Sequence, residues 1–107
     1  NAVPVKLAEY VANSLLAFVN SQAQLETNKE KFLSWLISVK QFSQRTASDT
    51  FSRVKRADKL YQINGIPDTY YIYQLEQHND FKSLSVDVRS QIKRATTLFS
   101  DYLQSAQ

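Results

Sequence analysis

Basic side chains are concentrated in two segments of this 107-residue chain. Residues 41–66 hold five Arg or Lys against two Asp, and three more basic residues lie within residues 89–94. Ser, Thr and Gln side chains stand between them. This mixture can contact phosphates and the edges of nucleic-acid bases in a groove of DNA. The same mixture is typical of a solvated helix face, so charge alone leaves both interpretations open.

Other kinds of chemistry have little support in the composition. The chain has no Cys and one His, His78, which excludes disulfides, a Cys nucleophile and the two-His zinc motifs. A single Gly argues against P-loop and Rossmann nucleotide sites, which need several. Glu26 and Glu30 are paired carboxylates, but a helix start explains them. We therefore expect no catalytic residues, no metal, no cofactor and no small-molecule substrate.

The elements that must position the basic residues are helices. Apolar residues recur at helical spacing, which predicts five helices and no sheet. The first is expected over residues 4–22. The second is expected to begin at Thr27, because Thr27 and Glu30 have the spacing of a capping box, and to end near residues 40–41.

Of the remaining three helices, the third and the fifth carry the two basic segments. The expected N-caps of these three helices are Ser43, Asp68 and Ser85. We expect the Asn64-Gly65 pair to stop the third helix, and the fourth and fifth to end near residues 78 and 103. Residues 79–84 are expected to form a loop whose Phe81 plugs the core.

The predicted organisation is an N-terminal helix in residues 1–26 followed by one helical domain in residues 27–107. No apolar run reaches the roughly 18 residues that a membrane-spanning helix needs, so we expect no membrane partner. Among the aromatic residues, Trp35 and Tyr102 are expected in the core. The cluster of Tyr70, Tyr71 and Tyr73 is expected to form core and rim rather than a base-stacking platform.

The second expected helix contains the motif Phe32-Leu33-Ser34-Trp35-Leu36. With this motif and those of the later helices, residues 27–104 resemble the core-binding domain of tyrosine recombinases, the phage integrase family, whose first helix reads Phe-Leu-x-Trp-Leu. Thr46 matches a Thr in the next link, whereas Thr50 stands where the family usually has Tyr. The pattern of the last helix is matched by Ser85, Arg89, Ile92, Ala95, Leu98, Phe99, Tyr102 and Leu103.

The resemblance implies an all-α fold, a compact bundle of four SAM-like helices preceded by one extra helix. It also implies double-stranded DNA as the partner, in site-specific recombination and integration of mobile DNA. The two basic segments correspond to the helices that the family places on DNA. The expected contacts are Arg45, Thr46, Ser52, Arg53 and Arg56 in the first, and Arg89, Ser90, Lys93 and Arg94 in the second.

The same resemblance implies a cytoplasmic protein of bacterial or phage origin. The family's catalytic Arg, His and Tyr set belongs to another domain and has no counterpart here, so this chain is expected to bind DNA without cutting it. The N-terminal helix is expected to pack on the bundle or contact a second protomer. Two alternatives stay open: a helical protein-interaction or regulatory module that docks through residues 1–22, and a DNA-binding part of a nuclease or transcriptional regulator.

Overall fold

The computed structural model describes residues 25–106, and all regular secondary structure in this range is helical. A first helix covers residues 25–38. After it come α2 (Gln44–Leu60), α3 (Thr69–Glu76), the short α4 (Asn79–Lys82) and α5 (Val86–Ser105). The predicted all-α fold is confirmed for the described residues, and the helix expected over residues 4–22 lies outside them.

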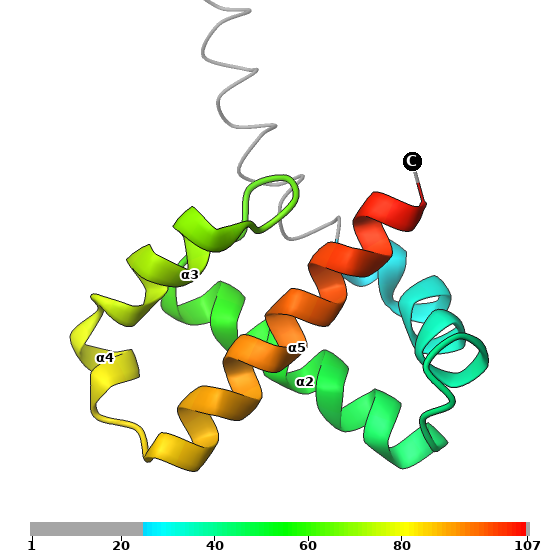
Figure 1. Ribbon diagram of the computed structural model, residues 1–107, viewed down its shortest axis with the longest axis horizontal. Helices are drawn as coiled ribbons and strands as arrows, with labels where there is room; N and C mark the ends of the chain where they lie inside the picture. Colours follow the sequence, from blue (N-terminus) through cyan, green and yellow to red (C-terminus); the bar gives the residue numbers. More distant parts are fainter. Residues whose placement is uncertain (1–24, 107) are drawn as a thin grey trace, which may run out of the picture.

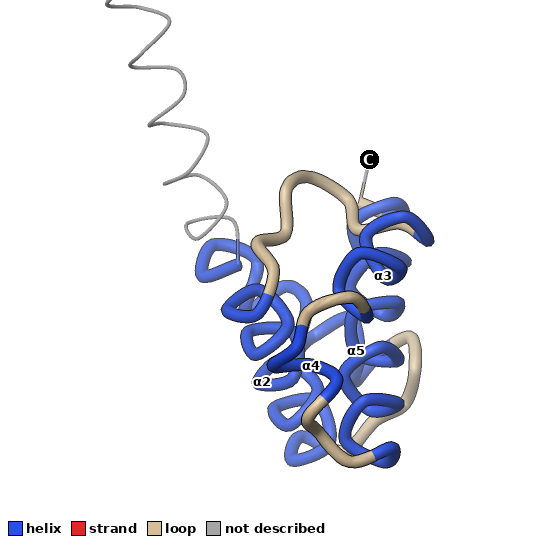
Figure 2. Tube along the Cα trace, turned by 90° about the vertical axis from the view of Figure 1, so that its left-hand side faces the viewer, coloured by secondary structure: helices blue, strands red, loops and turns tan. Residues whose placement is uncertain are grey.

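The helices form two layers with α5 lying across α2. Figure 1 shows this crossing near the centre of the molecule, and Figure 2 shows α2 in one layer with α3 and α5 in the other. Because α2 and α5 are the two most basic helices, their crossing brings the two basic segments of the sequence into one region.

Three predicted N-caps are confirmed. The side chains of Ser43, Asp68 and Ser85 each accept a hydrogen bond from the backbone N–H three residues later, at 3.1, 2.9 and 3.2 Å. Each bond satisfies an amide that the first helical turn leaves without an intrahelical partner. The starts of α2, α3 and α5 are therefore determined by local sequence.

The predicted start of the second helix at Thr27 is wrong. Residues 25 and 26 are already helical, and Thr27 is an exposed residue within the helix. The physical reason is the burial of Leu25, which is only 5% exposed and belongs to the core. Apolar contact at this position favours an earlier helical turn over the capping box.

The end of α2 also differs from the prediction. The helix stops at Leu60, before the Asn64-Gly65 pair, and Tyr61 is extended with φ −151°. Two hydrogen bonds hold the chain there: the Tyr71 hydroxyl donates to the Tyr61 carbonyl at 2.6 Å, and the Asp58 carboxylate accepts from the N–H of Ile63 at 2.9 Å. Gly65, at φ 68°, turns the chain only afterwards, toward α3.

The segment expected as a loop at residues 79–84 contains α4. Its single turn closes where the His78 carbonyl accepts from the N–H of Phe81 at 3.1 Å and from that of Lys82 at 2.9 Å. Phe81 is 1% exposed, so the predicted plug is confirmed. Burial of this ring fixes a turn that the local sequence does not predict.

One apolar core joins all the helices. Phe32 is fully buried in this core; its ring centroid is 5.2 Å from that of Phe99 and 5.4 Å from that of Tyr102. The Tyr102 hydroxyl donates to the side-chain oxygen of Asn28 at 3.0 Å, which satisfies its polar end. Trp35, expected in the core, is only partly buried and packs against the core. Tyr102 is 5% exposed and is a core residue, as expected.

Tyr71→Phe is expected to lower the free energy of unfolding by about 1–2 kcal/mol, because it removes the hydroxyl that donates to the carbonyls of Tyr61 and Ala57. Urea unfolding at neutral pH measures this loss. Tyr70 is 68% exposed, so Tyr70→Phe is the matched control and is expected to change little. Equal losses in both variants would contradict the role of the buried hydroxyl.

The same hydroxyl predicts a pH dependence of stability. Burial raises the pKa of Tyr71 above its ordinary value, and the charge of Asp58 and the Tyr61 phenol raise it further. Stability due to the neutral phenol is therefore complete below the unfolded-state pKa of about 10 and is lost as pH rises above it. Unfolding measured across this alkaline range is expected to show a smaller decline for Tyr71→Phe than for the wild type.

Candidate nucleic-acid interface

The candidate interface begins with a groove where α5 crosses α2. Its polar walls are Thr46 and Arg53 from α2 and Gln91 and Arg94 from α5, and its volume is about 280 Å³. The floor is formed by Phe42, Thr50, Ala95 and Leu98. We call this site the α2/α5 groove. Thr46, Arg53 and Arg94, predicted from sequence on two distant segments, are thus brought together.

The charge of the α2/α5 groove is not compensated by ion pairing. None of the described residues that line it is acidic. Within residues 25–106, ion pairs join Lys55 to Glu26 at 3.3 Å and Lys93 to Glu76 at 3.7 Å, and neither involves a residue of the groove. Arg53 is half-buried and Arg94 is exposed. The groove therefore presents two guanidinium groups beside a hydroxyl and a primary amide.

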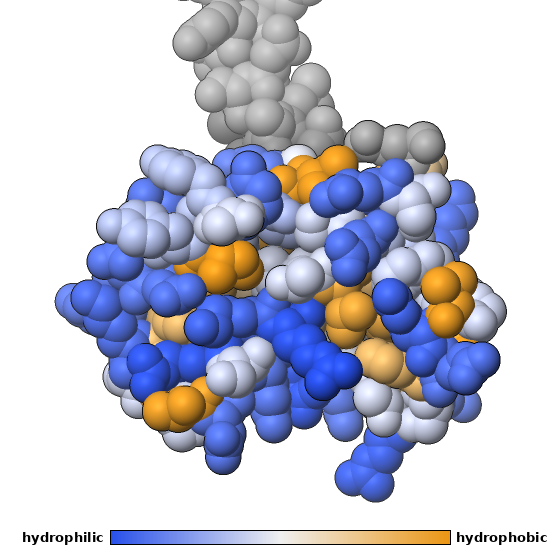
Figure 3. Space-filling model, in the orientation of Figure 1, coloured by the Kyte–Doolittle hydropathy of each residue, from blue (hydrophilic) through white to orange (hydrophobic). Residues whose placement is uncertain are grey.

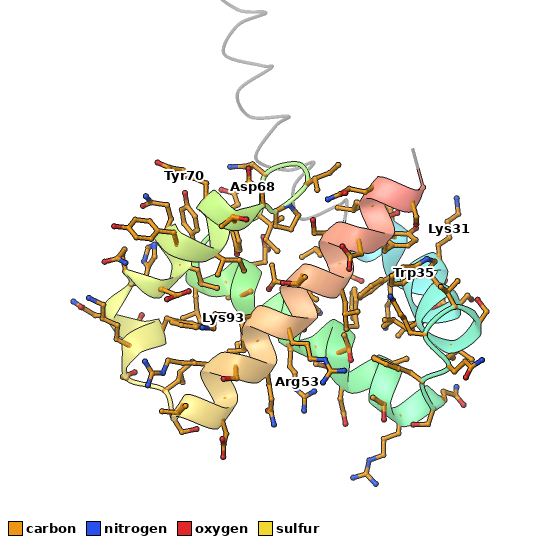
Figure 4. The ribbon with its side chains drawn as sticks, viewed as in Figure 1. Lys31, Trp35, Arg53, Asp68, Tyr70 and Lys93 are labelled. Carbon is orange, nitrogen blue, oxygen red and sulfur yellow. The ribbon has the colours of Figure 1, made fainter. Side chains whose placement is uncertain are left out.

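A second basic hollow lies on the other flank of α5. It is lined by Lys82 of α4, by Arg89, Ser90 and Lys93 of α5, and by Glu76 at the end of α3. Its volume is about 460 Å³, and Phe81 and Val86 complete its wall. We call it the α4/α5 pocket. Figure 4 shows Lys93 on the side of α5 nearer α4 and Arg53 below the crossing with α2.

Arg89 is the least satisfied side chain of the α4/α5 pocket. Its Nε atom is buried and has no hydrogen-bond partner. An unsatisfied buried donor is costly, and for a neutral group the cost is about 1–3 kcal/mol. The residue as a whole is half-buried and lines the pocket.

The remaining predicted contacts lie outside both hollows. Arg45, Ser52 and Arg56 are exposed on α2 at spacings of seven and four, so they share one helix face. This face adjoins the side of α2 that carries Thr46 and Arg53. The nine predicted residues therefore divide into three groups: the groove, the pocket and an exposed face of α2.

Three charged or amide side chains of these sites were not predicted. Gln91 precedes Arg94 by three positions, so helical spacing alone could have placed it on the same flank. Lys82 was missed because its segment was expected to be a loop. Glu76 joins the pocket only through its 3.7 Å ion pair with Lys93, a tertiary contact with no local signal.

The tyrosine cluster separates as expected into core and rim. Tyr71 is 7% exposed, while Tyr70 and Tyr73 are 68% and 59% exposed on α3.

The exposed His78 ring lies against Tyr61, with 5.1 Å between centroids. Figure 3 shows that the face around the crossing is largely hydrophilic, with apolar side chains in separate small patches.

The described residues contain neither a membrane-spanning helix nor a group of metal ligands. In residues 25–106, no helix combines the length and apolar character needed to cross a bilayer. In the same range, no three acidic or His side chains are grouped as ligands for a metal ion.

Comparison with known proteins gives no relative. No protein-family model, curated protein or solved structure matches this chain.

Proposed function

We propose that this chain binds double-stranded DNA through α2 and α5. The observation that carries the proposal is the α2/α5 groove, in which Arg53 and Arg94 from two crossing helices stand beside Thr46 and Gln91 with no carboxylate in the lining. Guanidinium groups bind phosphates through paired hydrogen bonds, and amide and hydroxyl groups can contact base edges. The α2/α5 groove therefore places groups that can bind phosphates beside groups that can contact base edges.

The shape of α5 supports the major groove as its target. An α-helix fits the width of the major groove of B-DNA. Ser90, Arg94 and Thr97 are exposed and follow one another at spacings of four and three, so they form one polar strip along α5. In this proposal the strip faces the DNA: Arg94 joins Arg53 in contacting one backbone, and Arg89 contacts the other.

The finer proposal is a role as the core-binding domain of a tyrosine recombinase. It is supported by the resemblance of residues 27–104 to that family and by the basic character of α2 and α5. In this role the chain grips DNA as half of a clamp during integration of mobile DNA, and strand cleavage belongs to another domain. Tyr102 is 5% exposed and its hydroxyl donates a hydrogen bond to Asn28. Both observations support a structural role for Tyr102 rather than a role as a nucleophile.

Fluorescence anisotropy with a random-sequence duplex, at low and at moderate salt, tests DNA binding. We expect binding that weakens as salt rises, because phosphate contacts release counterions from the duplex. Failure to bind at low salt would overturn the proposal and favour the protein-interaction alternative. That alternative would then be tested by removing apolar side chains from residues 1–22.

A further inference from the structure

We propose that the α4/α5 pocket is a phosphate-binding site, and that Glu76 occupies it as an internal competitor by pairing with Lys93. The inference deepens the proposed function, on which it rests, by assigning the pocket to a phosphate of the DNA backbone. It concerns a different flank of α5 from the α2/α5 groove, so the two sites can be tested separately.

The pocket gathers positive charge from two helices. Lys82 reaches it from α4, while Arg89 and Lys93 line it from α5, four residues apart on one helix face. The hydroxyl of Ser90 adds a donor, and Glu76 is the carboxylate in the lining. Three cations against one anion leave a net positive pocket, which favours a ligand of negative charge.

Arg89 points to an oxyanion as that ligand. Its Nε has no hydrogen-bond partner, although a guanidinium can donate in parallel from Nε and Nη to two oxygens of one phosphate. The planar guanidinium matches phosphate geometry and keeps its charge at all physiological pH values. A phosphate in the pocket would satisfy this unused donor once the Arg89 side chain rotates to bring its buried Nε toward the ligand.

The ion pair between Glu76 and Lys93 is weak enough for a phosphate to replace the carboxylate. The Nζ to Oε1 distance is 3.7 Å, and the two side chains are 43% and 39% exposed. Ion pairs with this exposure contribute little stability, so a phosphate can replace the Glu76 carboxylate at Lys93 without a large penalty. Phe81, buried beside Lys82, anchors the α4 side of the pocket.

The position of the pocket on α5 explains how it would serve DNA binding. Arg89 and Lys93 lie on one flank of the helix and Gln91 with Arg94 on the other, as the two separate linings require. A helix seated in a major groove has a phosphate backbone along each flank. The α2/α5 groove and the α4/α5 pocket would then contact opposite backbones.

Arginine side-chain NMR with inorganic phosphate tests the pocket. The chain has five arginines, so the Nε–Hε region holds few signals, and Arg89→Lys identifies that of Arg89. At constant ionic strength we expect phosphate to shift the Arg89 signal to saturation, with little change at Arg45 and Arg56. The backbone amide of Ser90 reports binding in Arg89→Lys, which keeps the charge but loses the Nε donor and is expected to weaken binding at least severalfold.

The role of Glu76 has a matched control elsewhere in the chain. Glu76→Gln is expected to tighten phosphate binding by about two- to fivefold, the range for removing a competing exposed ion pair. Glu26→Gln removes the same charge from the other ion pair, 3.3 Å from Lys55, and is expected to leave phosphate binding unchanged. Equal tightening in both variants would overturn the role of Glu76 as a competitor.

Two further outcomes separate the pocket from the proposed function. Absence of a saturable shift at Arg89, or equal shifts at all five arginines, would overturn the phosphate site. A duplex is expected to shift the Arg89 signal as free phosphate does. If phosphate shifts the signal and a bound duplex does not, the pocket stands as a site for free phosphate and its assignment to the DNA backbone is overturned.

Discussion

Replacing Arg53 and Arg94 together with Gln is expected to weaken duplex binding by at least about tenfold at low salt and to reduce the salt slope by about two. The two guanidinium groups line one groove from crossing helices, and neither belongs to an ion pair with a described residue. Their loss therefore removes two phosphate contacts at once. Gln preserves polarity and most of the volume, so the fold is expected to remain intact. Anisotropy titrations at several salt concentrations measure both effects.

The control removes the same charge from other parts of the surface. Lys31 on the first helix and Lys59 on the last turn of α2 are both exposed and line neither the groove nor the pocket. Lys31→Gln/Lys59→Gln is expected to have a small effect, limited to the reduced net charge. If this control weakens binding as much as Arg53→Gln/Arg94→Gln does, attraction is nonspecific and the groove is not the contact surface.

Phe32→Ala is expected to lower the free energy of unfolding by about 3–5 kcal/mol. Phe32 is fully buried and joins the first helix to α5 through Phe99 and Tyr102. A cavity there removes transfer free energy and leaves neighbouring rings without contacts. Native domains of this size have total stabilities near the lower end of about 5–15 kcal/mol. A large fraction of the Phe32→Ala molecules is therefore expected to be unfolded. Thermal and urea unfolding followed by circular dichroism measure the loss.

Ile37 provides a control on the same helix. Its side chain is 41% exposed, so Ile37→Ala is expected to cost well under half as much as Phe32→Ala. Phe32→Leu, which keeps an apolar side chain in the core, should lie between these two variants. Equal costs for Phe32→Ala and Ile37→Ala would contradict the burial of Phe32 in the core.

Features that depend on a few neighbouring residues could be predicted from the sequence. Ser43, Asp68 and Ser85 are N-caps because a short polar side chain can reach an amide three residues later whatever lies around it. The apolar periodicity likewise identified the buried faces of α2 and α5, including Val54 and Ile92. The basic character of these two helices follows from composition alone.

Features that depend on contacts between distant residues could not be predicted from the sequence. The end of α2 depends on a hydroxyl that Tyr71 brings from α3, and the turn of α4 depends on the burial of Phe81. The first helix already includes residues before Thr27 because Leu25 is buried in the core. In each case a long-range contact outweighs a local signal of about 1 kcal/mol.

The candidate interface shows the same division. By itself the sequence determined an all-α chain, the positions of most helix starts and the presence of two basic helices, because charge and capping are local properties. Only the tertiary structure decided that Arg53 and Arg94 share a groove, that Lys93 pairs with Glu76, and that Arg45 and Arg56 lie outside both hollows. The physical reason is that these relations depend on where α5 crosses α2 and on how α4 packs beside it, which many side chains determine together.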